Sequence, residues 1–341
     1  MKAMVLEAFN QPPVWRDVPD PTIGPRDVLV RVRAAGLCAT DLKIVDGLVP
    51  GVSLPHVSGH EAAGEIAEVG SEVAGLATGD HVTLYPTVGC GLCDPCRVGR
   101  ENLCLNAPRI GFEMDGGFAE YIKAPARNAV KIDSSVPLTQ ASVLPDAAAT
   151  CYHALARRAR VRAGETVVVV GVGGLGIHAV QLAMTMGARV IAADVEPDKL
   201  AAAREFGAET VDASEEPLPA QIDALTRGAK ADAVVECVGG SAVTGVLSDA
   251  VKCLKPNGRL MVVGYAYGAP LSVDTADLIH GQWDIMGTRA STLQDVVDVV
   301  RLVETGRLKP VVSETVAIEG LSEALETLRR RPPVGRTVLT I

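Results

Sequence analysis

Short apolar runs separated by turn residues dominate the first part of the chain. Up to about residue 140, runs such as 27–36, 64–70 and 80–86 alternate with glycine and proline. Runs of this length, bounded by turn residues, are typical of β-strands. Because no long helical period appears among them, we expect an irregular, β-rich domain here.

A different pattern begins near Val161. The continuous apolar run 165–171 is expected for a strand buried on both faces, and 174–188 has helical spacing. Further runs of the buried type, most of them separated by helical segments, lie at 189–195, 232–239, 258–265 and 283–289. Strands that alternate with helices indicate an α/β fold with a doubly wound parallel sheet. One amphipathic helix is then predicted within 293–306.

Composition and charge exclude two classes of partner. The chain has 341 residues and a formal charge of −9, so it lacks the basic footprint of a nucleic-acid-binding protein. No apolar run reaches the ~18–20 residues that a membrane span needs. The first residues also lack a signal-peptide pattern, so we expect a cytoplasmic protein that acts on a small molecule.

A glycine-rich turn follows the first buried strand of the α/β part. Gly171, Gly173 and Gly176 have G-x-G-x-x-G spacing, with Gly174 and Leu175 inside the motif. The first glycine permits the tight turn, the second lets the backbone approach a pyrophosphate, and the third lets helix and strand pack closely. The motif alone is weak evidence, but here it joins a strand to a helix, which favours a dinucleotide site.

Asp194 ends the next buried strand, 18 residues after Gly176. A carboxylate at this place accepts hydrogen bonds from the adenosine ribose and repels a 2′-phosphate. Lys199, which we include in the cofactor-binding set, and Arg189 lie nearby, but neither replaces the acid. The alternative is an ordinary turn aspartate. The context of the motif favours a cofactor site, and NAD rather than NADP.

Four of the eight cysteines fall within 15 residues. Cys90, Cys93, Cys96 and Cys104 have the spacing C-x2-C-x2-C-x7-C. Four thiolates form a closed tetrahedral Zn²⁺ site that leaves no position for substrate, so this site is predicted to be structural. An iron–sulfur cluster is the alternative metal group, since similar spacings occur there. Four free thiols in a loop are a further alternative, but the tight clustering of the cysteines argues against it.

Several segments together resemble the zinc-dependent alcohol dehydrogenases of the medium-chain dehydrogenase/reductase family. They are "GLCATD", "GHEAAGEIAEVG", "GDHV", the four-cysteine run, "GGFAEY", "GVGGLG" and "GRTVL", and they span nearly the whole chain. The resemblance implies a GroES-like, β-rich catalytic domain with a structural-zinc lobe, formed by residues 1–150 and 288–341. It implies a Rossmann NAD-binding domain at 151–287 and two Zn²⁺ ions per chain. Because no low-complexity linker separates the two parts of the chain, we also expect the domains to pack closely, with a cleft between them.

The resemblance also implies a catalytic zinc bound by Cys38, His60 and a third ligand. That ligand is usually a cysteine opening a segment C-A-G-x-T-x-Y-x-A-L, whereas this chain has "DAAATCYHAL". The register places Asp146 at the ligand position. In an α-helix, Cys151 would lie ~7.5 Å along the axis from Asp146 and His153 ~10 Å, too far to share one ion with it. The alternative is an aspartate that merely begins a helix.

Other roles follow from the same resemblance. Thr40 is expected to take the alcohol proton, and Lys43 stands where relatives often carry a relay histidine. Asp41 is expected to orient His60, and Glu61 either to bind zinc transiently or to form an ion pair with Arg336. The alternative for Thr40 and Lys43 is an ordinary surface position.

The remaining predicted residues surround the cofactor and the substrate. Arg336 is expected to contact the pyrophosphate or Glu61, and Thr150 to lie beside the nicotinamide. The expected lining of the cofactor crevice is Cys237, Val263 and Gly264. The expected wall of the substrate pocket is Tyr85, Ile110 and Trp283.

We therefore expect a zinc-dependent oxidoreductase that moves a hydride between NAD(H) and an alcohol/ketone or aldehyde pair, with secondary alcohols as substrates. A sorbitol-type polyol dehydrogenase and a hydroxyacyl-CoA dehydrogenase of the same family are alternatives. A non-catalytic NAD- and zinc-binding sensor is a third, although the set Cys38, His60, Asp146 and Thr40 argues against it. The family also suggests a homo-oligomer, with a tetramer favoured over a dimer.

Overall fold

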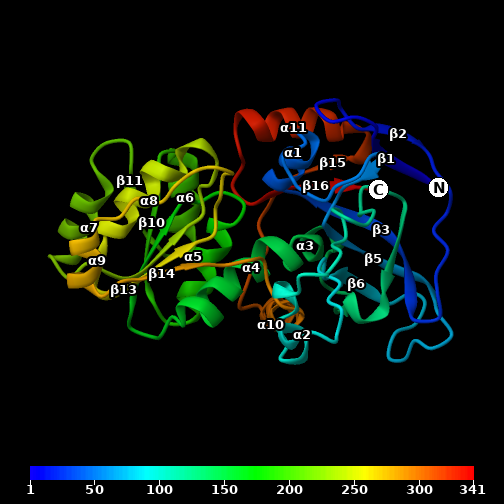
Figure 1. Ribbon diagram of the computed structural model, residues 1–341, viewed down its shortest axis with the longest axis horizontal. Coiled ribbons are helices and arrows are strands. Elements are labelled where there is room, and N and C mark those ends of the chain that lie inside the picture. Colours follow the sequence, from blue (N-terminus) through cyan, green and yellow to red (C-terminus); the bar gives the residue numbers. More distant parts are fainter. The chain divides into compact units, whose positions relative to one another are not determined.

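The computed structural model describes residues 1–341, which form two compact units (Figure 1). The first unit contains Met1–Ala149 and Ser291–Ile341, and the second contains Thr150–Ala290. None of the helices is long and apolar enough to cross a membrane.

The strands of the first unit form two sheets. The smaller has the order β2-β1-β4, and the larger has the order β15-β16-β3-β5-β6-β8, with β7 also paired to β3. The strands are β1 (Lys2–Leu6), β2 (Val14–Asp17), β3 (Asp27–Leu37), β4 (His56–Val57), β5 (Glu61–Val69), β6 (His81–Leu84), β7 (Tyr121–Pro125), β8 (Ala129–Lys131), β15 (Val312–Ala317) and β16 (Arg336–Thr340).

The helices of this unit are short, apart from two near the C-terminus. They are α1 (Ala39–Val45), α2 (Asp94–Arg97), α3 (Leu138–Ser142), α10 (Leu293–Glu304) and α11 (Leu321–Arg330), with 3₁₀ turns at Glu101–Leu103, Ala126–Asn128 and Ile318–Gly320. The helix predicted within 293–306 is α10. Thr292 and Asp295 begin it with reciprocal side-chain-to-backbone hydrogen bonds, which satisfy N–H groups that a helix start leaves free.

The alternation of apolar and polar residues explains the central strand of the large sheet. In β3, Val28, Val30 and Val32 are buried, whereas Arg31 between them is exposed. Successive side chains of a strand point to opposite faces, so one face of β3 enters the core while the other carries polar groups. The predicted β-rich character of this part of the chain is confirmed.

The second unit contains a six-stranded sheet in which all neighbouring strands are parallel. Its order is β11-β10-β9-β12-β13-β14. The strands are β9 (Thr166–Val170), β10 (Arg189–Asp194), β11 (Glu209–Asp212), β12 (Ala231–Glu236), β13 (Leu254–Val262) and β14 (Asp284–Gly287). The helices are α4 (Ala149–Tyr152), a π-helical segment His153–Ala159, α5 (Gly176–Thr185), α6 (Pro197–Glu205), α7 (Leu218–Thr226), a 3₁₀ turn Gly240–Ala242, α8 (Val243–Lys252) and α9 (Thr275–Gly281).

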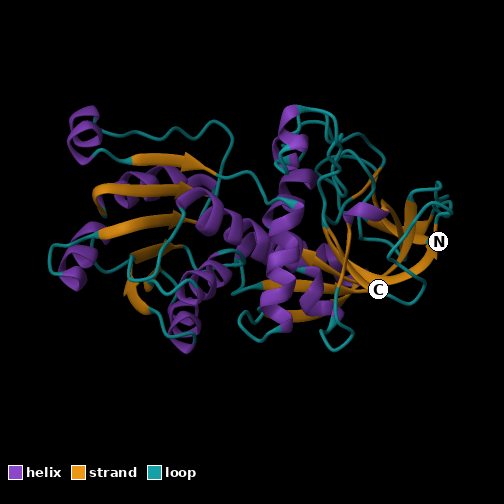
Figure 2. Ribbon diagram, turned by 90° about the horizontal axis from the view of Figure 1, so that it is seen from below, coloured by secondary structure: helices purple, strands orange, loops and turns teal.

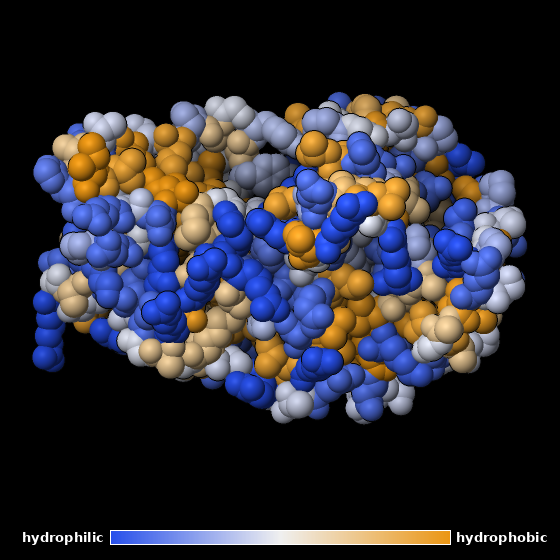
Figure 3. All heavy atoms as spheres, turned by 60° about the horizontal axis from the view of Figure 1, so that its bottom comes forward, coloured by the Kyte–Doolittle hydropathy of each residue, from blue (hydrophilic) through white to orange (hydrophobic).

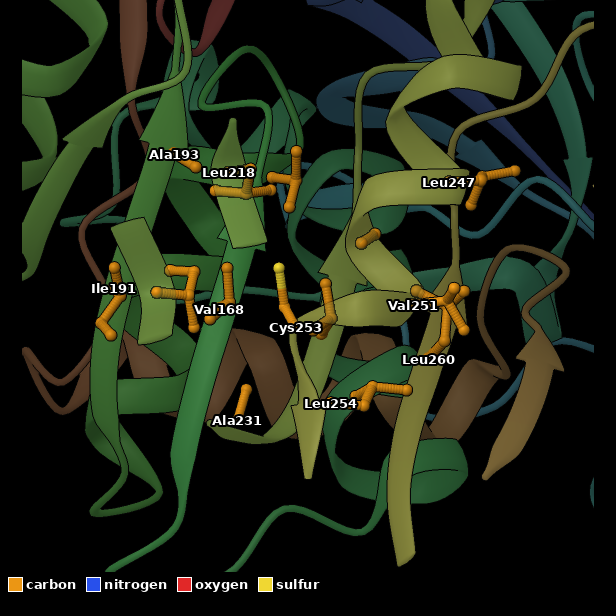
Figure 4. Close-up of a cluster of buried hydrophobic side chains, with 14 of the residues drawn as sticks. Val168, Ile191, Ala193, Leu218, Ala231, Leu247, Val251, Cys253, Leu254 and Leu260 are labelled. Carbon is orange, nitrogen blue, oxygen red and sulfur yellow. The ribbon is translucent and has the colours of Figure 1, made fainter. Parts of the chain in front are cut away.

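Helices cover both faces of this parallel sheet, as Figures 1 and 2 show. Val168 lies in an apolar cluster with Leu218 of α7 and with Leu247 and Val251 of α8 (Figure 4). The next residue, Val169, faces the other way, toward Gly176 at the start of α5. Burial on both faces explains why β9 is a continuous run of valines. The doubly wound sheet and its sixth strand are therefore confirmed.

Candidate active site

Cys38 is held at the junction of β3 and α1. It is the residue that precedes the helix, and its N–H donates to Asp41 Oδ2 over 2.8 Å. The Cys38 Sγ in turn accepts a hydrogen bond from the N–H of Thr40, at 3.5 Å. The start of α1 therefore fixes the position of the thiol, which is 6% exposed as a residue.

His60 reaches the same place from the turn between β4 and β5. The turn needs glycine at position 59, where φ is +101° and a Cβ would lie 2.7 Å from the backbone nitrogen of Phe118. The His60 ring packs on Phe112, with centroids 5.1 Å apart. Its Nδ1 lies 3.3 Å from Asp41 Oδ1, and neither atom has another hydrogen-bond partner. Asp41 thus lies where the expected orienting role requires it.

Asp146 approaches from a π-helical turn, Leu144–Ala148, rather than from the α-helix that we assumed. Its Oδ2 lies 3.7 Å from His60 Nε2 and 3.7 Å from Cys38 Sγ. Cys151 and His153 are both buried, and the Cys151 thiol donates instead to the carbonyl of Leu175, at 3.2 Å. Neither belongs to the potential metal-binding groups of the structure.

Four side chains bring potential metal-binding atoms together. One atom each from Cys38, His60, Glu61 and Asp146 lies within 4.8 Å of the others. A cysteine, a histidine and a carboxylate are the donor types that catalytic Zn²⁺ sites use, and three of them leave a further position for substrate. The donor chemistry of this group therefore fits Zn²⁺.

Arg336 supplies the positive charge next to these donors. Its Nε lies 2.9 Å from Glu61 Oε1, and its Nη2 lies 3.1 Å from Asp146 Oδ2 and 3.3 Å from Cys38 Sγ. Burial raises the pKa of Glu61 to about 8, although the Arg336 guanidinium opposes this. Burial also acts to raise the pKa of Asp146, but His60 and Arg336 hold it well below its usual value. The expected contact of Arg336 with Glu61 is present, and its contact with a pyrophosphate stays a prediction.

Sheet pairing explains how these distant residues meet. Leu37, at the end of β3, is paired with Thr337 of β16, and Gly36 is paired with Glu61 of β5. A Cβ on Gly36 would lie 2.1 Å from Glu61 Oε2, so the glycine leaves room for the Glu61 carboxylate above β3. The carboxylate can then reach Arg336, at the start of β16.

Two further predicted residues lie on α1 beside the thiol. Thr40 Oγ1 is 3.6 Å from Cys38 Sγ, and the Thr40 side chain is partly exposed. Lys43 lies three residues later, on the same side of the helix, and burial lowers its pKa. Both side chains could therefore exchange protons near the donor group.

The four clustered cysteines form a second potential metal site. Their sulfur atoms lie within 4.8 Å of one another, on the segment around α2 and the turn Glu101–Leu103. Cys90 accepts backbone hydrogen bonds from Leu92 and Cys93, which lower its pKa to about 6 and favour the thiolate that a metal binds. All eight cysteines of the chain are free thiols, so no disulfide competes for these sulfurs.

The glycine motif joins β9 to α5 as predicted. A Cβ on Gly176 would lie 1.8 Å from the carbonyl oxygen of Gly171, so helix and turn can approach this closely only without a side chain. Gly171 itself has φ +87°. Asp194 Oδ2 accepts a hydrogen bond from Val172 N–H at 2.7 Å, and Lys199 Nζ lies 3.8 Å from Asp194 Oδ1. These contacts place the carboxylate beside the turn.

A pocket of ≈490 Å³ opens at this end of the sheet, within the usual range for small ligands. Its apolar lining includes Val195, Ala213 and Val246, which our sequence reasoning did not name. Val195 and Ala213 directly follow β10 and β11. Their position just after strand ends was the signal that could have identified them.

We expect Gly176→Ala to weaken NADH binding at least about tenfold, or about 1.4 kcal/mol, because the new Cβ pushes α5 away from the turn. NADH fluorescence titration measures this. Gly287→Ala is the matched control, since a Cβ there meets nothing within 4 Å. Equal weakening by both substitutions would contradict the explanation.

The structure shows how the three residues expected in the wall of the substrate pocket are packed, and their place in that wall stays a prediction. Ile110 and Tyr85 are 0% and 1% exposed, and the Tyr85 hydroxyl donates to the carbonyl of Ser291. Trp283 packs on the apolar cluster of the second unit, and its Nε1–H donates to the carbonyl of Lys255. The sequence pattern showed large apolar side chains but not whether each would be used in the core.

Comparison with known proteins identifies the family. Residues 24–134 match the family described as "Alcohol dehydrogenase GroES-like domain", and residues 174–305 match "Zinc-binding dehydrogenase". An NAD-dependent alcohol dehydrogenase of Sulfolobus acidocaldarius is 33% identical, over 100% of both chains. The chain belongs to the zinc-dependent alcohol dehydrogenase family. Among solved structures, the alcohol dehydrogenase of Aeropyrum pernix has a TM-score of 0.93 and 35% identity, with 100% of each chain covered.

The family also includes enzymes with other substrates. An acryloyl-coenzyme A reductase of Metallosphaera sedula is 32% identical, over 100% of both chains. Since relatives of similar identity differ in name and substrate, membership of the alcohol dehydrogenase family identifies the type of chemistry more firmly than the substrate.

Proposed function

We propose that this protein is an NAD-dependent zinc alcohol dehydrogenase that interconverts secondary alcohols and ketones. The observation that carries the proposal is the meeting of Cys38, His60 and Asp146 in one unit of a chain whose other unit has a complete dinucleotide-binding turn. The full-length similarity to enzymes named as NAD-dependent alcohol dehydrogenases supports it.

We assign two zinc sites. Cys38, His60 and Asp146 would hold the catalytic ion, and Cys90, Cys93, Cys96 and Cys104 the structural one. Cys38 and Asp146 contribute two negative charges, which balance Zn²⁺. In this arrangement Glu61 has both oxygens near Arg336, so we assign it as an ion-pair partner. Its transient binding to zinc stays a prediction.

The zinc ion and NAD would each have one chemical task. When bound, zinc supplies a Lewis acid that polarises the substrate oxygen, and NAD supplies the hydride acceptor. The Thr40 hydroxyl, beside Cys38, takes the proton of the alcohol. Thr40 gives its own hydroxyl proton to the neutral amine of Lys43, on the same side of α1, and Lys43 passes a proton on to solvent. Burial favours that neutral amine by lowering the pKa of Lys43. Asp41 keeps the His60 ring oriented.

The cofactor is assigned to the second unit. Gly171, Gly173 and Gly176, with Gly174 and Leu175, would hold the pyrophosphate, and Asp194 with Lys199 the adenosine ribose. The apolar pocket beside Val195 suits the adenine ring. Thr150, Cys237, Val263 and Gly264 are assigned to the nicotinamide side.

A substrate panel followed at the absorbance of NADH tests the proposal. It should contain secondary alcohols, primary alcohols, sorbitol-type polyols and hydroxyacyl-CoA esters, each with NAD and with NADP. We expect the highest kcat/KM with a secondary alcohol and NAD. Preference for a CoA ester would favour the acyl-CoA alternative, which the acryloyl-coenzyme A reductase relative makes specific. If none of these substrates is turned over, the alternative of a non-catalytic NAD- and zinc-binding sensor is favoured.

We further propose a homotetramer in the reducing cytoplasm. Hydrophobic residues gather in patches between hydrophilic residues on the face that Figure 3 shows. Exposed apolar side chains of the second unit include Ile279, at 69% exposure, and Tyr267, at 56%. Such groups support association between copies of the chain. Eight free thiols support a reducing compartment.

A further inference from the structure

Glu236 is a buried carboxylate that the proposed mechanism does not use. It is the last residue of β12, it is 0% exposed, and no cation is among the groups that shift its pKa. Burial raises its pKa, although backbone N–H groups of Gly239, Val238 and Gly264 oppose this. Its Oε2 has no hydrogen-bond partner. Because a buried, unpaired carboxyl group is costly, its presence calls for a specific purpose.

The contacts of Glu236 join two loops. Its Oε1 accepts hydrogen bonds from the N–H groups of Val238, at 2.6 Å, and Gly239, at 2.9 Å. Its backbone carbonyl accepts from Val263 at 3.0 Å and from Gly264 at 3.1 Å. One residue therefore holds both the segment that follows β12 and the segment that follows β13.

These segments pack too tightly to shift independently. Gly239 has φ +62° and ψ −164°, a conformation that is essentially restricted to glycine. A Cβ on Gly264 would lie 2.4 Å from the nitrogen of Gly239 and 2.8 Å from Glu236 Oε1. On the opposite side, a Cβ on Gly171 would lie 2.7 Å from Val238 Cγ2. The loop at 238–239 thus lies between the cofactor-binding turn and the end of β13.

This loop lies where a dinucleotide must pass. The chain builds β9, β10 and β11 outward on one side of the sheet and then crosses to β12, so the strand order reverses between β9 and β12. Ligands of such sheets bind at this reversal, beyond the carboxyl ends of the strands. Asp194 marks the adenosine side on β10. The other half of the cofactor then extends over β12 and β13, toward the loop that Glu236 holds.

We propose that Glu236 is a positioning residue for the nicotinamide half of the cofactor. Its carboxylate keeps residues 238–239 beside Gly171, in the place that this half requires. Without an acceptor, the N–H groups of Val238 and Gly239 would lose their partner, and the strained loop would relax. The inference rests on the proposed NAD-dependent function.

Two substitutions and two probes test the proposal. Glu236→Met keeps the shape but removes the acceptor, whereas Glu236→Gln keeps an oxygen for both N–H groups. Dissociation constants are measured by fluorescence titration for NADH and by competition for ADP-ribose, which lacks the nicotinamide. We expect Glu236→Met to weaken NADH at least about tenfold and ADP-ribose less than about threefold, with Glu236→Gln close to the unchanged protein.

Val234→Ala is the matched control, because Val234 is a fully buried residue of the same strand, paired with Val168 of β9. It should leave the ratio of the two dissociation constants unchanged. If Glu236→Met fails to fold by circular dichroism, Gly239→Ala replaces it, since φ +62° strains an alanine there.

NADH binding within threefold of the unchanged protein, or equal weakening of NADH and ADP-ribose, overturns the role of Glu236. Failure of the unchanged protein to bind NADH overturns the proposed function itself, and this inference with it. The two failures are therefore distinguishable.

Discussion

Replacing Asp146 with alanine is expected to reduce bound zinc from about two ions per chain to about one, and to lower kcat/KM on the order of 10³-fold, or about 4 kcal/mol. The substitution removes one of two anionic donors, and leaves only Cys38 and His60 with Glu61, which Arg336 holds. Because the Arg336–Glu61 pair remains, the fold should survive. Metal analysis by mass spectrometry and steady-state kinetics measure the two effects.

Asp17→Ala is the matched control for this prediction, since Asp17 lies on an exposed part of β2. It should keep both metal ions and full activity. An Asp146→Ala protein that retains two zinc ions would contradict the assignment of Asp146 as a ligand, and would leave it as an ordinary aspartate of the π-helical turn.

Asp146→Cys separates the charge of the ligand from its chemical type. A thiolate conserves the negative charge, so zinc content should stay near two ions per chain. A carboxylate is a harder donor that delocalises less charge onto the metal, which leaves a stronger Lewis acid. We therefore expect the pH profile of kcat to shift to higher pH in Asp146→Cys. An unchanged profile would refute this electronic explanation but not the ligand assignment.

Replacing Cys104 with serine is expected to remove the other metal ion and to destabilise the chain. Cys104 is 1% exposed and lies among the sulfurs of Cys90, Cys93 and Cys96. Loss of a structural metal belongs to the substitutions that cost more than about 4 kcal/mol. For a domain of this size, such a loss lowers the midpoint of thermal unfolding by on the order of 10 °C. Calorimetry and metal analysis measure it.

Cys253→Ser provides the same chemical change in a buried cysteine outside the lobe. Cys253 is 1% exposed and its thiol donates to the carbonyl of Asp249, a bond that serine can also make. It should retain both metal ions. If Cys104→Ser kept its metal and lost no more stability than Cys253→Ser, the clustered cysteines would act only by packing. A brown protein that contains iron would show the alternative cluster.

Local patterns predicted the elements that carry the site. The valine run of β9 and the glycines at 171, 173 and 176 predicted a strand followed by a turn and a helix. These elements could be predicted because each depends mainly on residues that are neighbours in the sequence. Register against the family motif selected Asp146 over Cys151 and His153. The structure replaces the assumed α-helix by a π-helical turn, and Asp146 still groups with Cys38 and His60, whereas Cys151 and His153 belong to no potential metal-binding group.

Contacts between residues that are distant in the sequence could not be predicted from these local patterns. Tyr85 and Ile110 were expected in a pocket wall, and only the structure shows how deeply both are buried, at 1% and 0% exposure. Glu236 stood within an apolar strand, with nothing nearby in sequence to show that its carboxylate would join the ends of β12 and β13. A periodicity tells which face of an element is buried, but not which other element covers that face.

By itself, the sequence of this protein determined the doubly wound sheet, the dinucleotide turn, the clustered cysteines and the candidate ligands, because each of these depends on spacing along the chain. Only the tertiary structure decided that Asp146, 108 residues from Cys38, lies 3.7 Å from its sulfur. It also decided that Arg336 Nη2 lies 2.8 Å from Glu61 Oε1. The physical reason is the pairing of β16 and β5 with β3, which brings three distant segments to one sheet end and lets opposite charges meet out of water.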